Sequence, residues 1–111
     1  MEPAQTTNLP TIERIREALK EIYDPEIPIN ILDLGLIYKI EPAPPGKVTV
    51  EFTVTNPACP VGDQLASKIR ENVARLDGVT EVEVRLIWDP PWNKEKMSFE
   101  GKLQASMLGF A

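Results

Sequence analysis

The feature that most constrains the fold is a strand–helix–strand pattern in the second half of the chain. Residues 47–55 and 79–88 are rich in β-branched and aromatic side chains, which is typical of strands. Between them, apolar residues recur at helical spacing over 61–76, and Gly78 then favours the end of a helix. Two strands joined by a helix form a right-handed crossover, so we expect the later strand to run parallel to the earlier one.

The first half predicts a helix followed by a hairpin. Thr11 is placed to cap a helix that stops near Asp24, and the turn sequence 43–46 separates a strand over 34–42 from the strand over 47–55. The apolar positions of this helix are Ile12, Ile15, Leu19 and Ile22. In the second strand apolar and polar residues alternate, which predicts one covered and one more polar face.

We therefore predict an α+β fold, a two-layer α/β sandwich with a mixed three-stranded sheet and the order α-β-β-α-β plus a short C-terminal helix. In that last helix Phe99, Leu103 and Met107 recur every four residues. A chain of 111 residues fits one domain, which we assign to 11–111, after a disordered N-terminal tail over 1–10.

Composition excludes several classes of function. The net charge of −5 disfavours nucleic acids and anionic membranes as partners. The chain has no histidine, which removes His-based catalysis and His-ligated zinc, and it has neither a P-loop nor a dinucleotide-binding glycine motif. A single cysteine, no secretory signal and no transmembrane run predict a cytoplasmic protein.

The single cysteine, Cys59, stands between Pro57 and Pro60, just before the second predicted helix. Pro60 suits the first position of a helix, which would place the Cys59 sulfur near free backbone N–H groups and the positive end of the helix dipole. Both favour the thiolate, the form that binds metal or attacks an electrophile. The alternative is a small buried hydrophobic side chain.

Four further features each have a functional and a structural interpretation. Asp24 and Glu26 offer carboxylates to a site or simply end the helix. Asp33 lies in an apolar run and needs a partner or a function, unless it forms an Asx turn. The segment from Trp88 to Trp92 is a recognition surface or a corner that covers the core. The C-terminal helix binds a partner or docks on its own domain.

Three motifs together resemble a known family. "DPEIPINILDLGLIYKI", "TVTNPACPVGDQL" and "LIWDPPWNKEKMS" occur in the order and spacing typical of proteins related to SufT, to the eukaryotic MIP-type iron–sulfur targeting factor and to PaaD, a domain also called domain of unknown function fifty-nine. The resemblance runs from about Ile12 to the C-terminus. We expect a short stand-alone member, because the 111 residues contain neither the cysteine-rich extension of PaaD-type relatives nor an ATPase motif.

The resemblance implies a fold shared with iron–sulfur assembly domains and a role as carrier or targeting adaptor rather than as enzyme. The family's functional positions fall on Thr55, Cys59, Pro60, Asp24, Glu26, Asp33 and Asp89. A cluster needs several thiolates, so a labile cluster or iron ion held by Cys59 would be shared with a second copy or a client. We expect Asp33 or Glu26 to supply an oxygen ligand or a hydrogen bond to another ligand, and Thr55 to form a hydrogen bond with the sulfur.

The alternative function is an adaptor that binds an assembly scaffold or a PaaD-like oxygenase subunit without holding a cluster. The residues expected to bind partners are Trp88, Asp89, Trp92, Phe99, Leu103 and Met107. The expected partners are iron–sulfur assembly proteins and apo-clients, with a homodimer as a further candidate. No side chain of the chain is an obvious base for the thiol, which disfavours a thiol enzyme.

Overall fold

The computed structural model of the protein describes residues 10–55 and 61–109. Its elements are α1 (Ile12–Leu19), β1 (Ile37–Ala43), β2 (Lys47–Phe52), α2 (Val61–Ala74), β3 (Glu81–Leu86), the 3-10 turn η2 (Lys94–Lys96) and α3 (Phe99–Leu108). This order confirms the predicted α-β-β-α-β pattern with a C-terminal helix. The predicted tail lies outside the described residues except for Pro10, which is buried beside α1.

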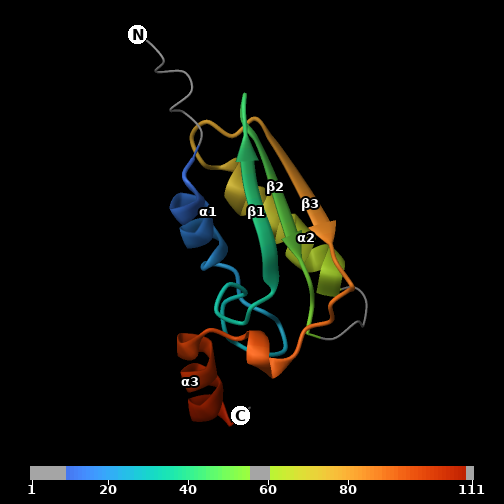
Figure 1. The fold of residues 1–111 in the computed structure, drawn as a ribbon. Helices are drawn as coiled ribbons and strands as arrows, with labels where there is room; N and C mark the ends of the chain where they lie inside the picture. The colour runs from blue at the N-terminus through green and yellow to red at the C-terminus, as the bar shows by residue number, and fades with distance from the viewer. Residues whose placement is uncertain (1–9, 56–60, 110–111) are drawn as a thin grey trace.

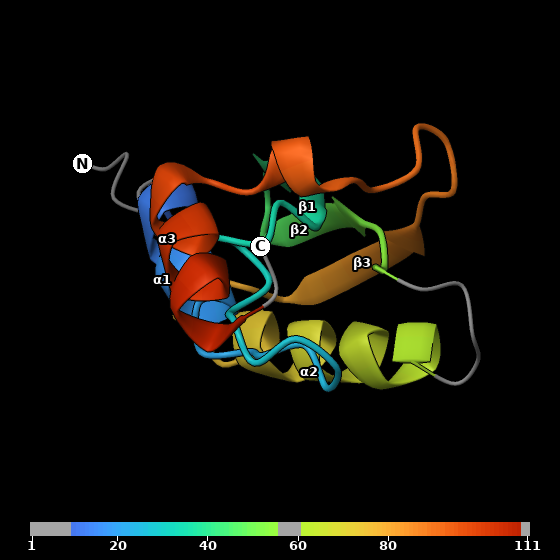
Figure 2. The same cartoon turned by 90° about the horizontal axis from the view of Figure 1, so that it is seen from below.

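The sheet has the order β1-β2-β3, with β2 in the centre. β1 pairs with β2 antiparallel and β2 pairs with β3 parallel, as the hairpin and the crossover predict. α2 covers one face of the sheet, and α1 packs beside it at the β1 side (Figures 1 and 2). The core is aliphatic and fills the space between these two layers. The predicted two-layer α+β fold with a mixed sheet is confirmed.

α1 begins as predicted but ends earlier. The Thr11 hydroxyl accepts a hydrogen bond from the Arg14 backbone N–H at 3.1 Å, which caps the helix. The helix stops at Leu19 because the following backbone enters other hydrogen bonds, among them Ile31 N–H to the Ile22 carbonyl at 2.9 Å. Ile22 is still buried, whereas Ile12, which also lies at an apolar position of the predicted helix, is half-exposed.

β2 is more deeply buried than its alternation predicts. Val48, Val50 and Phe52 face the helices and are fully buried. Thr49 and Thr53, which we expected on a polar face, are also buried. The reason is that β2 is flanked by a strand on each side, so its neighbours cover even small polar side chains.

α2 buries the predicted stripe of Leu65, Ile69 and Val73 against the sheet. The turn after it contains Gly78 at φ +90°, the left-handed conformation that glycine adopts without strain. α2 thus returns the chain to the start of β3. No helix within 10–55 and 61–109 has the length and apolar character needed to cross a bilayer.

Candidate functional site

The described residues of the three motif regions meet at one end of the sheet. The chain enters β1 where it leaves β2 and β3, because β1 is antiparallel to both. At this end the Leu36 carbonyl accepts from Thr53 N–H at 2.8 Å, and the Phe52 carbonyl accepts from Ile87 N–H at 2.7 Å. The N-terminus of α2 lies at the same end (Figure 1). We call this the site end; it holds the turn 24–36, Thr55 and the corner 88–92.

Asp33 fastens the C-terminal helix to the site end. Its Oδ1 accepts a hydrogen bond from the Ser98 hydroxyl at 2.8 Å, and its Oδ2 accepts one from Asn30 Nδ2 at 2.7 Å. Its carbonyl oxygen also accepts from Ser98 N–H at 2.8 Å. A Cβ on Gly101 would clash with that carbonyl oxygen. We call these four residues the Asp33 latch.

The Asp33 side chain does not form the Asx turn that the sequence offered as an explanation; it takes part in the Asp33 latch instead. The N–H of Gly35 bonds to the Leu32 carbonyl at 3.0 Å, and the Asp33 carboxylate instead joins two side chains, one of them distant in sequence. Both carboxylate oxygens therefore already accept a hydrogen bond. Each oxygen still has a second lone-pair site, so these two bonds alone do not exclude a further contact at Asp33.

Asp24 and Glu26 occupy different environments in the same turn. Asp24 is buried, and its Oδ2 accepts hydrogen bonds from the N–H groups of Glu26 and Ile27, both at 2.9 Å. Its Oδ1 is buried without a hydrogen-bond donor among the described residues. Glu26 is exposed. Asp24 therefore shapes the turn, while Glu26 presents its carboxylate to solvent.

The two tryptophan side chains of the corner 88–92 differ in exposure. Trp92 is half-buried against the core, and its indole N–H donates to the Leu34 carbonyl at 2.6 Å. Trp88 is 56% exposed, and Asp89 is exposed beside it. Trp92 thus holds the corner on the turn before β1, while Trp88 and Asp89 remain accessible.

An open hollow of about 530 Å³ lies next to the corner, lined by Gly35, Ile37, Tyr38, Pro90 and Lys96. The Tyr38 hydroxyl donates to the Pro90 carbonyl at 2.8 Å. The ammonium of Lys96 lies 5.1 Å from the centre of the Tyr38 ring, within range of a cation–π interaction. Partial burial raises the pKa of the Tyr38 hydroxyl.

The C-terminal helix presents its large apolar side chains to solvent. α3 buries Gly101 and Ala105, whereas Phe99 is 82% exposed, Met107 78% and Leu103 47%. Figure 1 shows α3 below the sheet, beyond the turn between α1 and β1. Docking of α3 on its own domain therefore uses the small side chains and leaves the predicted apolar face uncovered.

The predicted metal site is only partly described. Cys59 and Pro60 lie outside the described residues, between Thr55, which is half-buried, and the start of α2. Within 10–55 and 61–109, no three acidic or cysteine side chains come together in a way that could hold a metal ion. The roles of Cys59, Thr55, Glu26 and Asp33 toward iron stay predictions.

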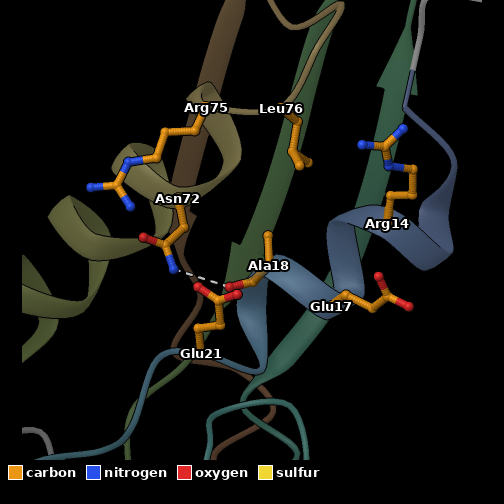
Figure 3. A pocket seen from close by; sticks show the side chains of 7 residues that line it. All are labelled: Arg14, Glu17, Ala18, Glu21, Asn72, Arg75 and Leu76. Atoms are coloured by element: carbon orange, nitrogen blue, oxygen red, sulfur yellow. Dashed lines mark hydrogen bonds between the residues drawn. The ribbon is translucent and has the colours of Figure 1, made fainter.

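A separate depression of about 270 Å³ lies between α1 and α2 and contains none of the predicted site residues (Figure 3). Asn72 of α2 points toward α1 and donates from Nδ2 to the Ala18 carbonyl at 3.0 Å. The charged side chains that line the depression are Arg14 and Glu17 of α1, together with Glu21 and Arg75, which follow the ends of the two helices. The depression marks the contact between the two helices.

Sequence reasoning missed four residues that build the site end: Asn30, Tyr38, Ser98 and Gly101. Ser98 carried a usable signal, since a serine directly before an apolar helical pattern favours an N-cap, and its hydroxyl does accept from Gly101 N–H at 3.0 Å. Its second bond, to Asp33, joins residues 65 positions apart. No local pattern indicates that contact.

Comparison with known proteins is consistent with this architecture. The family model described as "Iron-sulfur cluster assembly protein" matches residues 12–84. The chain is 43% identical to a Fe-S protein maturation auxiliary factor of Porphyromonas gingivalis, over 90% of this chain and 95% of the relative. It is 37% identical to the Fe-S protein maturation auxiliary factor SufT of Staphylococcus aureus, over 74% of this chain and 93% of the relative.

A solved structure shares the fold. The Domain of Unknown Function DUF59 from Bacillus anthracis superposes with a TM-score of 0.81 at 27% identity, over 95% of this chain and 97% of that chain. The family match covers well over half of the chain, and the relatives align along almost their whole length. On these grounds the chain belongs to the family of iron–sulfur cluster assembly proteins.

Proposed function

We propose that this chain acts in the maturation of iron–sulfur proteins, carrying or targeting an iron–sulfur cluster or iron ion to apo-proteins through Cys59. The observation that carries the proposal is the convergence of three motif regions at the site end, where β2 leads toward Cys59 and α2 begins. The relatives named as Fe-S protein maturation auxiliary factors support the same process.

The proposed chemistry depends on one thiolate and few other candidate ligands for iron. One cysteine in the chain cannot complete the ligand set of a cluster, so the cargo is held jointly with a second thiolate source and is easily released. Glu26 is our first candidate for an oxygen ligand, because it is exposed, whereas each oxygen of Asp33 already accepts a hydrogen bond within the fold. No catalytic step is part of this function.

The test is anaerobic reconstitution followed by iron and sulfide analysis and absorption spectroscopy. We expect Cys59→Ser to lose the bound iron, Glu26→Gln to weaken its retention, and Glu81→Gln, an exposed glutamate at the far end of the sheet, to behave as the parent protein. A purified apo-ferredoxin then serves as acceptor for transfer. Undiminished iron in the Cys59→Ser protein would contradict the carrier function.

A second candidate is an adaptor that holds no cluster and binds an assembly scaffold or an oxygenase subunit. The exposed Trp88 and the uncovered face of α3 favour it, because large apolar side chains at the surface mark binding sites. Trp92 contributes less free surface, since its indole is bonded within the fold. Capture of scaffold proteins that survives Cys59→Ala but fails for Trp88→Ala would favour the adaptor.

A further inference from the structure

We propose that the outer edge of β3 pairs with the same edge of a second copy, antiparallel and in one fixed register, so that two sheets join into one. This contact does not depend on the iron–sulfur function. Three features of the structure support it: free backbone groups along β3, a protected edge on the other side of the sheet, and an order of charges in β3 that is complementary to itself.

β3 has backbone groups along its outer edge that bond to no other described residue. On its inner edge, Ile87 N–H donates to the Phe52 carbonyl at 2.7 Å and Glu81 N–H to the Gly46 carbonyl at 3.3 Å. Because the backbone direction alternates along a strand, the odd-numbered residues of β3 face β2. Figure 1 shows α2 behind β3 rather than beyond its outer edge. The residues that present their N–H and C=O groups at this edge are Val82, Val84 and Leu86.

The opposite edge of the sheet, β1, carries features that prevent such pairing. Pro42 has no backbone N–H to offer, and a β-bulge interrupts the strand between Ile37 and Lys39. β3 has no proline, and its register with β2 is regular over 81–86. Proteins commonly protect exposed strand edges with prolines and bulges, so the regular edge of β3 is the one open to a partner strand.

The charges of β3 select one register for a second copy. In an antiparallel pair centred on Val84, Glu83 of each copy lies opposite Arg85 of the other, in the type of pair whose side chains come closer together. Centring the pair on Glu83 or on Arg85 would instead place like charges directly opposite each other, which is destabilising. Charges on an edge strand repel most partners, but here they attract a second copy in a single register.

The other face of β3 carries apolar side chains that the same pairing covers. Val82, Val84 and Leu86 are partly buried against the core, whereas Val48 and Val50 of the central strand are fully buried. The difference arises because β3 has no strand on its outer side. In the register centred on Val84, the two Val84 side chains lie opposite each other, and Val82 lies opposite Leu86. These are the pairs that exchange backbone hydrogen bonds.

The resulting contact is two-fold symmetric and closed, so it gives dimers and no longer assemblies. Its axis passes through the sheet beside Val84 and joins two three-stranded sheets edge to edge, with β1 at each outer margin. Because the paired strands are antiparallel, the two site ends point in opposite directions along the joined sheet. Both site ends therefore stay open to other proteins.

The test combines sedimentation equilibrium of the full chain without iron with amide hydrogen exchange measured by NMR spectroscopy. We expect a reversible dimer. At low protein concentration the N–H groups of Val82, Val84 and Leu86 should exchange quickly, while those of Glu83 and Arg85 are protected by β2. At high concentration both sets should be protected, which identifies β3 as the contact.

Charge reversal tests the register. Glu83→Arg and Arg85→Glu each place like charges opposite each other, so each should weaken the dimer about tenfold or more. Mixing the two single variants should restore the dimer, because every facing pair is then one arginine and one glutamate. The double variant that carries both changes should dimerise like the parent chain for the same reason. The matched control is Glu41→Arg, which reverses one charge of the Lys39–Glu41 pair on the protected edge and should leave the dimer unchanged.

Three outcomes would overturn the proposal: a chain that is monomeric at every concentration, a dimer that both single reversals leave unchanged, and a dimer in which Val84 N–H stays unprotected. A monomer whose β3 edge becomes protected only when another protein is added would assign the edge to that protein. Circular dichroism separates loss of contact from loss of fold, and the double variant keeps the test decisive where a single variant unfolds. No measurement here involves iron, so failure of the carrier function is detected separately.

Discussion

Two regions of this molecule are stabilised in different ways. The core between the sheet and the helices is stabilised by aliphatic packing, and the site end is stabilised by individual hydrogen bonds. In the first region Val48, Val50 and Ile69 are fully buried among other hydrocarbon side chains. In the second, Asp24, Asp33 and Trp92 each make bonds of defined direction. Packing tolerates changes of shape that conserve volume, whereas directed bonds fail even when shape is conserved.

The largest expected effect tests the packed region. Among the described residues Phe52 is the largest fully buried side chain, and it lies in the central strand. Phe52→Ala should lower the free energy of unfolding by about 3–5 kcal/mol, because it removes buried surface and leaves a cavity. Urea denaturation measures the change. Phe52→Leu should cost clearly less, and equal losses for the two substitutions would contradict a tolerant core.

The next largest effect tests whether the backbone conformation and the close packing at Gly35, in the site end, require glycine. Gly35 has φ +82°, and a Cβ there would collide with the Lys96 carbonyl. Gly35→Ala should lower the free energy of unfolding by about 3 kcal/mol, of which about 1–2 kcal/mol comes from the left-handed backbone. Gly109 has nearly the same φ, +87°, with no atom near its Cβ position. Gly109→Ala should therefore show only the smaller loss, and urea denaturation compares the two.

A third test breaks the latch without changing its shape. Asp33→Asn keeps the volume but replaces one acceptor oxygen by a donor, which faces the hydroxyl of Ser98 or the amide of Asn30. We expect a loss of about 1.5–3 kcal/mol, the range for hydrogen bonds to a charged group. Hydrogen exchange should quicken in α3 more than in β2. The control is Glu26→Gln, at an exposed position. Similar stability of the two variants would contradict a stabilising role for the Asp33 hydrogen bonds.

The smallest effect concerns the exposed charges on the open face of the sheet. Glu83 bonds to Lys47 at 3.0 Å and to Arg85 at 2.7 Å. These bonds lower the pKa of Glu83 below 4.5 and raise the pKa of Lys47 above 10.5. The stabilisation by Glu83 is thus present above pH 4.5 and is lost as the pH falls through its lowered pKa. The contribution of Lys47 is present below pH 10.5 and is lost as the pH rises through its raised pKa.

Comparison of Glu83→Gln with the parent protein should therefore show a small difference at neutral pH that disappears in acid and at high salt. Urea midpoints at pH 7 and pH 3, with and without salt, measure it. Glu41→Gln, which removes a bond to Lys39 at 3.2 Å on the same face, is the control for a simple pair. A difference that is unchanged at low pH would assign the effect to something other than charge.

The packed region could be predicted from the sequence and the site end could not. Periodicity places Leu65, Ile69 and Val73 on one face of α2, and a period of two places Val48 and Val50 on one face of β2, because each pattern is local. The exceptions are Ile12, which is exposed, and Thr49, which is buried; both depend on what the rest of the fold covers.

The site end depends on contacts between distant parts of the chain. Asp33 is bonded to Ser98, and Trp92 to the Leu34 carbonyl, over 65 and 58 positions. The sequence identified Asp33 and Trp92 as unusual because a carboxylate in an apolar run and a large aromatic side chain at a corner both need a partner. It gave no indication which partner each would find, and so it could not separate structural from accessible side chains there.

The parallel pairing of β2 with β3 also determines how the chain reaches its native state. Val48 lies beside Val82, so the sheet is completed only after a long loop has closed, and α2 lies within that loop. Closing a loop before its contacts exist costs entropy, which makes this step slow. The hairpin of β1 and β2 closes a much shorter loop and can form earlier. We therefore expect the hairpin to form before the crossover is completed.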